Sequence, residues 1–185
     1  MKENIAVIFP GIAYTCQERL LIECANKYKT IGYDVVNINF SSVEFDMNKT
    51  LKYNFNLTKD IILNQIKDID FDKYEDVVFL SKSIGTSCAA WLEDYLNINV
   101  RQFFLTPIPL CLEYLKNTEN VMAMVIGTKD KFIDFKEVES FCKRNNIKCL
   151  IFKDVGHSLK YKVDDGETEK LNERVVETVT RRYEV

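Results

Sequence analysis

The chain has 185 residues, of which 46% are hydrophobic and only three are proline. This length and this apolar content are typical of one domain with one core, so we expect a single domain over residues 1–185. Lysine and arginine number 25 against 28 acidic residues, which gives a formal net charge of -3. Because no basic excess marks a nucleic-acid-binding surface, we expect no nucleic acid partner.

Cysteine spacing and the distribution of apolar residues exclude several other classes of protein. The six cysteines form no Cys-x-x-Cys pair, and with a single histidine in the chain we expect no metal site. We interpret the cysteines as small buried residues in a reducing compartment. Residues 5–13 are apolar but are interrupted by Pro10-Gly11, and no stretch approaches the roughly 20 residues that a membrane span requires. We therefore expect a soluble, cytoplasmic protein without a membrane span.

The first third of the chain alternates between strand and helix patterns. Residues 5–9 predict a strand, and residues 17–30 carry apolar side chains at the spacing of a helix with one buried face. The β-branched residues within 34–40 predict a second strand. The segment 41–56 is polar, aromatic and irregular, and we assign no structure to it. Thr58 is predicted to cap the helix that follows.

The middle of the chain begins with a short buried strand. The apolar run 77–80 stops at a Ser-x-Ser-x-Gly turn, and apolar residues then recur at helical spacing up to about Asn97. Residues 101–105 predict the next strand, which ends at 106–109 because the two prolines there prevent further pairing. A short helix is expected over 110–116.

The last third predicts two more strands and two more helices. Residues 121–126 and 148–152 have the composition of buried strands. Residues 134–145 predict a helix in which Asp134 is the capping residue. A final helix is expected over 167–182.

Six strands separated by helices indicate an α/β fold with a mainly parallel sheet. Several strands are apolar enough to be covered on both faces, which predicts a three-layer sandwich. In such sheets, ligands bind at the carboxyl ends of the strands. The loops that follow the strands are therefore the first places to look for a site.

Three such loops contain side chains that are suited to nucleophilic catalysis. Ser83 follows the third strand, Asp130 the fifth, and His157, the only histidine, the sixth. A serine hydroxyl needs a general base, and histidine supplies one when a carboxylate holds its tautomer. The alternative for Ser83 is an ordinary helix N-cap. Asp134 is the competing carboxylate, although its role as a helix cap already explains it.

The motifs around these residues resemble those of the α/β-hydrolase superfamily. Ser83-Ile84-Gly85 resembles the nucleophile elbow, with Ser81 in place of the usual first glycine. Gly127 to Asp130 and Gly156-His157 resemble the loops that carry the acid and the histidine of that family. The resemblance covers nearly the whole chain and implies a small, dienelactone-hydrolase-like serine esterase that lacks the first two strands and a large cap. By that analogy, Asp130 is the acid of the triad.

The resemblance also places an oxyanion hole, which needs two N–H donors. One donor should be the backbone N–H of Ile84, which follows the nucleophile. The other falls on the backbone N–H of Ile12, in a loop where Pro10 replaces the histidine of the family.

Four further residues surround these positions in the sequence. Gly11, Tyr14 and Pro107 are candidates for the pocket, although packing at the start of a helix explains Tyr14 equally well. Lys82, next to the nucleophile, is expected to point away from Ser83 as a solvated charge.

Two classes of function follow from this sequence. The first is a cofactor-independent serine hydrolase that cleaves a small carboxylic ester or thioester through an acyl-enzyme, with a small-molecule acyl substrate as its expected partner. The second is a non-catalytic domain, either a doubly wound fold that binds phosphate or flavin at helix N-termini or a hydrolase fold without turnover that binds a partner. Substrate identity, acyl length and oligomeric state stay open.

Overall fold

The computed structural model describes residues 3–163 and 166–181, and its centre is one sheet of six strands. All neighbouring strands run parallel, in the order β2-β1-β3-β4-β5-β6. The bounds of the strands are β1 Glu3–Phe9, β2 Tyr33–Asn37, β3 Tyr74–Lys82, β4 Arg101–Leu105, β5 Val121–Gly127 and β6 Lys148–Phe152. The prediction of an α/β fold with a parallel sheet is confirmed.

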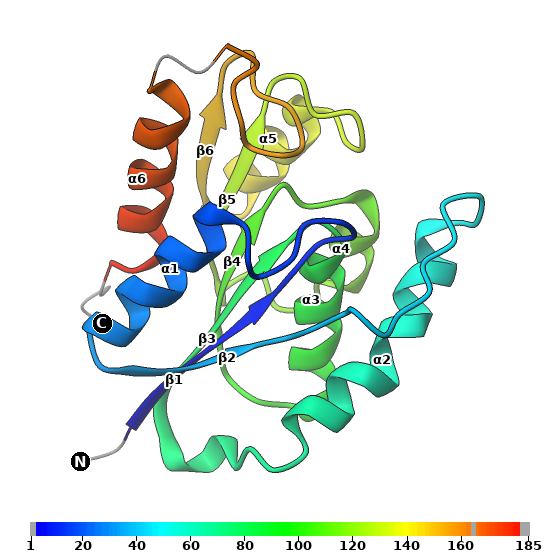
Figure 1. Cartoon of the computed structure of the whole chain (residues 1–185), viewed down its shortest axis with the longest axis vertical. Coiled ribbons are helices and arrows are strands. Elements are labelled where there is room, and N and C mark those ends of the chain that lie inside the picture. The colour runs from blue at the N-terminus through cyan, green and yellow to red at the C-terminus, as the bar shows by residue number, and fades with distance from the viewer. Residues whose placement is uncertain (1–2, 164–165, 182–185) are drawn as a thin grey trace.

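Helices cover both faces of the sheet, as Figure 1 shows. Helices α1 and α6 pack on one face, and the other four α-helices pack on the opposite face. Their bounds are α1 Arg19–Thr30, α2 Leu51–Ile66, α3 Ile84–Leu96, α4 Pro109–Tyr114, α5 Phe135–Arg144 and α6 Glu167–Val179, with a 3-10 turn η1 at Phe71–Lys73.

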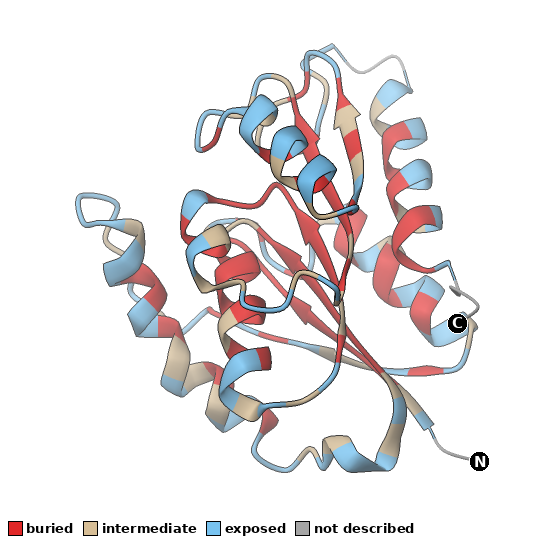
Figure 2. Cartoon of the chain, turned by 180° about the vertical axis from the view of Figure 1, so that it is seen from behind, coloured by how far each residue is buried: buried red, intermediate tan, exposed pale blue. Residues whose placement is uncertain are grey.

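The core is divided by the sheet into two apolar layers. Because strand side chains alternate between faces, Val7 and Phe9 of β1 enter the layer under α2, α3 and α5, whereas Ala6 and Ile8 enter the layer under α1 and α6. Figure 2 shows the central strands buried along most of their length. Strands that are covered on both faces are what the continuous apolar runs of the sequence predict.

The start of α2 was predicted wrongly. The helix begins at Leu51, and its N-cap is Thr50, whose hydroxyl oxygen accepts from the backbone N–H of Tyr53 at 3.1 Å. Thr58 lies inside the helix, where its hydroxyl donates to the backbone carbonyl of Phe55 at 2.7 Å. A threonine that bonds back within its own turn is compatible with a helix interior. The unassigned segment 41–56 therefore contains the first turns of this helix.

Two other element ends differ from the prediction. Strand β2 ends at Asn37, three residues early, although the backbone N–H of Ile38 still donates to the carbonyl of Ile8 at 2.9 Å. Helix α6 ends at Val179, and the predicted end at residue 182 lies outside the described residues.

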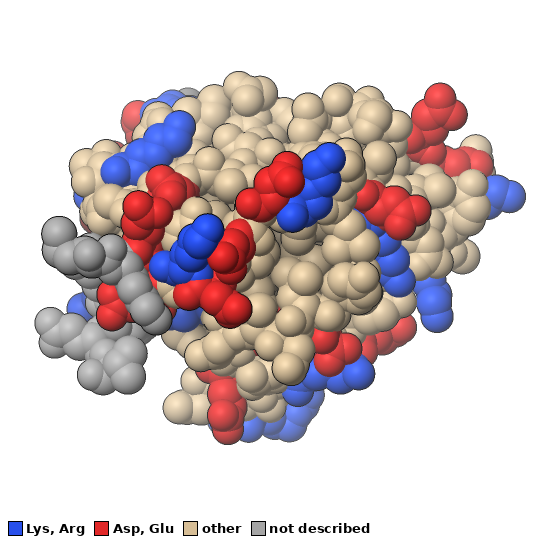
Figure 3. Space-filling model, turned by 90° about the horizontal axis from the view of Figure 1, so that it is seen from below, with Lys and Arg blue, Asp and Glu red and all other residues tan. Residues whose placement is uncertain are grey.

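One face of the molecule carries charges of both signs. On the face of Figure 3, acidic and basic side chains lie interspersed, without an extended region of either sign. Within residues 3–163 and 166–181, no helix is both long enough and apolar enough to cross a membrane.

The carboxyl end of β5 lies directly against the loop that follows β6. A Cβ atom added to Gly127 would sit 2.1 Å from the carbonyl oxygen of Val155. The same two segments are joined by hydrogen bonds from the backbone N–H of Thr128 to the carbonyl of Phe152 at 2.9 Å and from that of Lys129 to the carbonyl of Val155 at 2.8 Å. Only glycine allows this contact, so the loops after β5 and β6 behave as one unit.

We expect Gly127→Ala to lower the free energy of unfolding by about 2 kcal/mol or more, because the added methyl group meets backbone atoms that cannot move aside. Urea denaturation measures the change. The matched control is Gly156→Ala, where the nearest atom to an added Cβ, the carbonyl oxygen of Lys129, lies 3.7 Å away. Equal losses in the two variants would contradict the proposed contact.

Candidate active site

Ser83 occupies a sharp turn between β3 and α3. Its backbone has φ 57° and ψ -123°, a conformation that residues other than glycine rarely adopt. The turn is held because the backbone N–H of Ser83 donates to the carbonyl of Leu105 at 3.0 Å. A half-buried hydroxyl is therefore presented at the carboxyl edge of the sheet.

The side chain of Ser83 does not cap the helix. Ser83 stands at the N-cap position of α3, but its hydroxyl makes no capping hydrogen bond. Its Oγ instead lies 2.7 Å from Nε2 of His157. The ordinary-cap interpretation of this serine is wrong.

Two glycines allow the turn to lie close to the end of β1. A Cβ atom on Gly85 would sit 2.5 Å from the carbonyl oxygen of Pro10, and one on Gly11 would sit 3.0 Å from Cβ of Ser83. The start of α3 therefore packs directly against residues 9–11. Ser81, two residues before the nucleophile, stands where the family has its first glycine. It is buried, and its hydroxyl donates to the carbonyl of Phe103 at 3.3 Å.

His157 bridges Ser83 and Asp130. Nδ1 of His157 lies 2.7 Å from Oδ2 of Asp130, and the side chain of Asp130 has no exposed surface. Since a carboxylate only accepts, Nδ1 carries the proton and Nε2 is free to accept from the Ser83 hydroxyl. The other carboxylate oxygen, Oδ1, accepts from the backbone N–H of Phe132 at 2.9 Å. Three side chains from three loops thus form one hydrogen-bonded line.

The competing carboxylate has a structural role. Asp134 is the N-cap of α5, where its Oδ1 accepts from the backbone N–H of Lys136 at 2.9 Å. It makes no hydrogen bond to His157.

The pKa of His157 is lowered from its ordinary value. Burial is the largest cause, since it disfavours the charged imidazolium, and the positive charge of Lys82 lowers the pKa further. The hydrogen bond from His157 to Asp130 and the charge of that carboxylate raise it and oppose the first two effects. The ring of Phe132, 4.4 Å from the imidazole between centroids, covers one side of it. The net lowering of the pKa favours the neutral imidazole, the form that can accept a proton.

The prediction for Lys82 was wrong. Its side chain does point away from Ser83, as strand alternation requires, but it is only 1% exposed and is not solvated. Nζ donates to Oγ1 of Thr106 and, at 2.6 Å, to the backbone carbonyl of His157, and it lies 4.8 Å from the ring centroid of Tyr14. Burial lowers the pKa of Lys82 to about 7, and the charge of Asp130 acts in the opposite direction. Sequence reasoning also missed Phe132 and the contact of Thr106 with Lys82, because no motif marks either.

The remaining predicted residues lie around the turn. Within the described residues, the backbone N–H groups of Ile84 and Ile12 make no hydrogen bond. Tyr14 is buried with its ring over the lysine, which matches the packing interpretation. Pro107 is buried just after β4.

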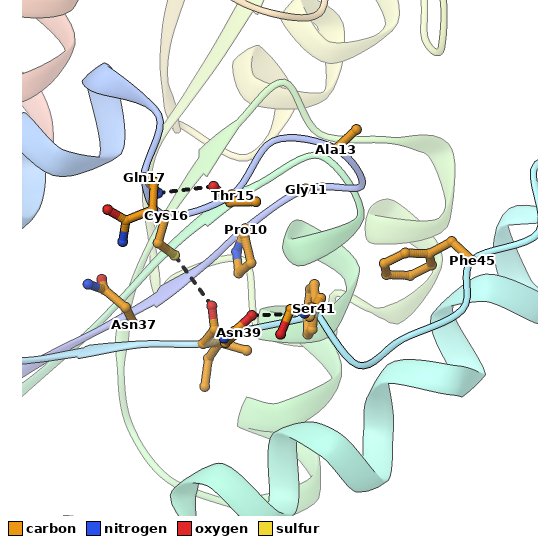
Figure 4. Close-up of a pocket in the computed structure, with 12 residues that line it drawn as sticks. Pro10, Gly11, Ala13, Thr15, Cys16, Gln17, Asn37, Asn39, Ser41 and Phe45 are labelled. Carbon is orange, nitrogen blue, oxygen red and sulfur yellow. Dashed lines mark hydrogen bonds between the residues drawn. The ribbon is translucent and has the colours of Figure 1, made fainter.

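Two hollows open near these loops. The first, of about 580 Å³, lies between the turn after β1 and the segment after β2, and Figure 4 shows Pro10 and Gly11 facing it from one side and Phe45 from the other. The residues that line it carry no formal charge. The second, of about 820 Å³, is lined by His157 and Phe132 together with lysines of the neighbouring loops. Among the described residues, no group of three or more His, Cys, Asp or Glu side chains is placed to hold a metal ion.

No protein-family model matches the chain, and no curated protein matches it in sequence. Solved structures are similar to it in fold. A hydrolase-superfamily protein from Xanthomonas campestris pv. campestris has a TM-score of 0.65 and 14% identity, with 95% of this chain and 97% of that chain covered. A lid-free α/β serine hydrolase from Xanthomonas campestris has a TM-score of 0.60 and 12% identity, over 95% of this chain and 80% of that one. An esterase from Pyrococcus furiosus has a TM-score of 0.59 and 15% identity, over 96% and 84%.

These similarities define the class of fold. The chain has the α/β-hydrolase fold, in a form with a six-stranded, wholly parallel sheet. The resemblance seen in the sequence motifs is confirmed at the level of the fold.

We expect Asp130→Asn to lower the pKa of His157 below that of the unaltered protein, because Asp130 is the group that favours the imidazolium. As His157 is the only histidine, its imidazole proton signal in a nuclear magnetic resonance titration reports this pKa directly. Asp134→Asn is the matched control and should leave the titration unchanged. An unchanged midpoint in Asp130→Asn would contradict the geometry.

Proposed function

We propose that the protein is a serine hydrolase that cleaves a small carboxylic ester or thioester through an acyl-enzyme, with Ser83, His157 and Asp130 as its triad. The observation that carries the proposal is the continuous line of hydrogen bonds from Ser83 Oγ through the imidazole to Asp130, each 2.7 Å long. A nucleophile, a base and a group that orients the base are the three parts that this chemistry needs.

The acylation step follows from the donor and acceptor roles in that line. Ser83 Oγ attacks the carbonyl carbon of the substrate while His157 Nε2 takes the hydroxyl proton. As the tetrahedral intermediate collapses, the bond to the leaving group breaks, and His157 returns the proton to the departing alcohol or thiol. Asp130 stays ionised and stabilises the transient imidazolium. Water then repeats the two transfers on the acyl-enzyme and releases the acid.

The oxyanion of the intermediate needs donors that are not already occupied. We assign this role to the backbone N–H groups of Ile84 and Ile12. Two features support the assignment: neither group bonds to another described residue, and Gly11 brings the loop of Ile12 against Ser83. The N-terminus of α3 adds the positive end of a helix dipole at the same point.

The two hollows suggest how a substrate is divided between them. Since His157 protonates the leaving group, the leaving half belongs on the side of the hollow that His157 and Phe132 line. The hollow beside Gly11 has no charged side chain, which favours an uncharged acyl group there. The lid-free serine hydrolase and the esterase among the similar structures fit an enzyme of this kind.

We expect a fluorescent alkyl phosphonate to label the protein at one site and Ser83→Ala to abolish that labelling, because the reagent forms a covalent bond only with an activated hydroxyl. Ser81→Ala is the matched control, since Ser81 lies two residues away, buried and bonded to a backbone carbonyl, and it should still be labelled. Equal labelling of Ser83→Ala would refute the assignment of the nucleophile.

Hydrolysis of p-nitrophenyl acetate tests turnover. We expect Ser83→Ala and His157→Gln each to reduce kcat by about 10³-fold or more, since the groups of a triad act as a unit. The acid limb of kcat/KM should lie below the ordinary pKa of histidine, 6.5, because burial lowers the pKa of His157. A protein that is labelled by the phosphonate but turns over no ester or thioester would instead support the partner-binding alternative.

A further inference from the structure

Lys82 is a buried ammonium group that the proposed reaction does not use. It lies one residue before the nucleophile, on the opposite face of β3, in the layer that Val78 and Leu80 of the same strand enter. Nine-tenths or more of its surface is removed from water, a state that lysine rarely adopts unless partners compensate. Since an apolar residue would fill the same space at lower cost, the charge calls for an explanation.

The partners of Lys82 come from three different loops. Thr106 follows β4, Tyr14 lies in the turn after β1, and the carbonyl that accepts from Nζ belongs to His157 itself. Thr106 has φ 45°, a strained value for a β-branched residue, and its own backbone N–H donates to the carbonyl of Val125 at 2.7 Å. Nζ therefore connects the ends of β3 and β4 to the backbone of the histidine loop.

We propose that Lys82 is a positioning residue for His157: its side chain holds the backbone of the histidine loop in place, and its positive charge opposes protonation of the imidazole. The proposal rests on the proposed function, in which His157 is the base. It adds a buried group, Lys82, that affects the position and the protonation of that base. No hydrogen bond joins Lys82 to Ser83.

The charge of Lys82 is present in the pH range where it matters. The titratable groups that face Lys82 are Tyr14, Asp130 and His157, each on a different loop. Because the pKa of Lys82 is about 7, the ammonium is charged wherever His157, whose pKa lies below 6.5, takes up its proton. As the pH falls, Lys82 therefore takes up its proton before His157 does. Repulsion between the two positive charges then keeps the imidazole unprotonated down to a lower pH.

The decisive variant is Lys82→Met, which keeps the length of the side chain and removes its charge and its donors. We expect the ratio of kcat/KM at pH 8.5 to that at pH 5.5 to rise about threefold or more, because the imidazole is protonated at higher pH without the lysine. We also expect kcat to fall while KM changes less than twofold, since the histidine loop loses an anchor. Lys82→Arg keeps the charge and should restore the pH ratio.

A titration of the single histidine tests the same point without substrate. In Lys82→Met, the midpoint of the His157 imidazole signal should move to higher pH than in the unaltered protein. Lys160→Met is the matched control: Lys160 lies 5.9 Å from the centroid of the Tyr14 ring but pairs with Glu18 at the surface, so its removal should leave the midpoint in place.

An unchanged midpoint and an unchanged pH ratio in folded Lys82→Met would overturn the proposal. If Lys82→Met does not fold, Lys82→Gln provides the same neutral comparison with a side chain that can still donate hydrogen bonds. If the unaltered protein hydrolyses no ester but Lys82→Met shifts the His157 midpoint, only the enzyme assignment is refuted. If the unaltered protein hydrolyses esters but Lys82→Met leaves the midpoint unchanged, only the role of Lys82 is refuted.

Discussion

The structure depends on one backbone turn, in which β3 ends and α3 begins around a single residue with positive φ. Ser83 adopts this conformation because residues 9–11 and the end of β4 close around it, with no room for a side chain at Gly85. The turn sets the direction of the hydroxyl, the start of the helix dipole and the opposite orientation of Lys82. A wider turn would separate Ser83 from His157 and Lys82 from Thr106.

The second half of the site is assembled away from that turn and reaches it through one side chain. Gly127 allows backbone contact between the loops after β5 and β6, and Asp130 and His157 belong to these two loops. The imidazole then spans the distance to Ser83. Backbone packing between the two loops brings the carboxylate and the imidazole within hydrogen-bond range of each other.

Topology explains why so much could be predicted from the sequence. Parallel strands bring every loop after a strand to one edge, so Ser83, Asp130 and His157 were expected to meet there, and they do; their catalytic roles remain proposals. Lys82 could not be placed in the same way, because its burial depends on Thr106, Tyr14 and the histidine loop, which are distant in sequence. Strand alternation gave its direction but not its surroundings. Thr58 shows the same limit within one helix, since the residue type alone does not distinguish a threonine inside a helix from one that caps it.

The buried Lys82 and the half-buried His157 also bear on how the fold withstands acid. Both groups bind protons less tightly in the folded chain than in the unfolded chain, where their pKa values are near 10.5 and 6.5. As pH falls from about 10.5 to 7, the unfolded chain takes up a proton at Lys82 that the folded chain resists, and from 6.5 downward the same holds for His157. The contribution of these two groups to stability is therefore greatest in alkali and declines in two stages with acidification. The two groups whose contribution to stability declines with acidification therefore lie at the proposed active site.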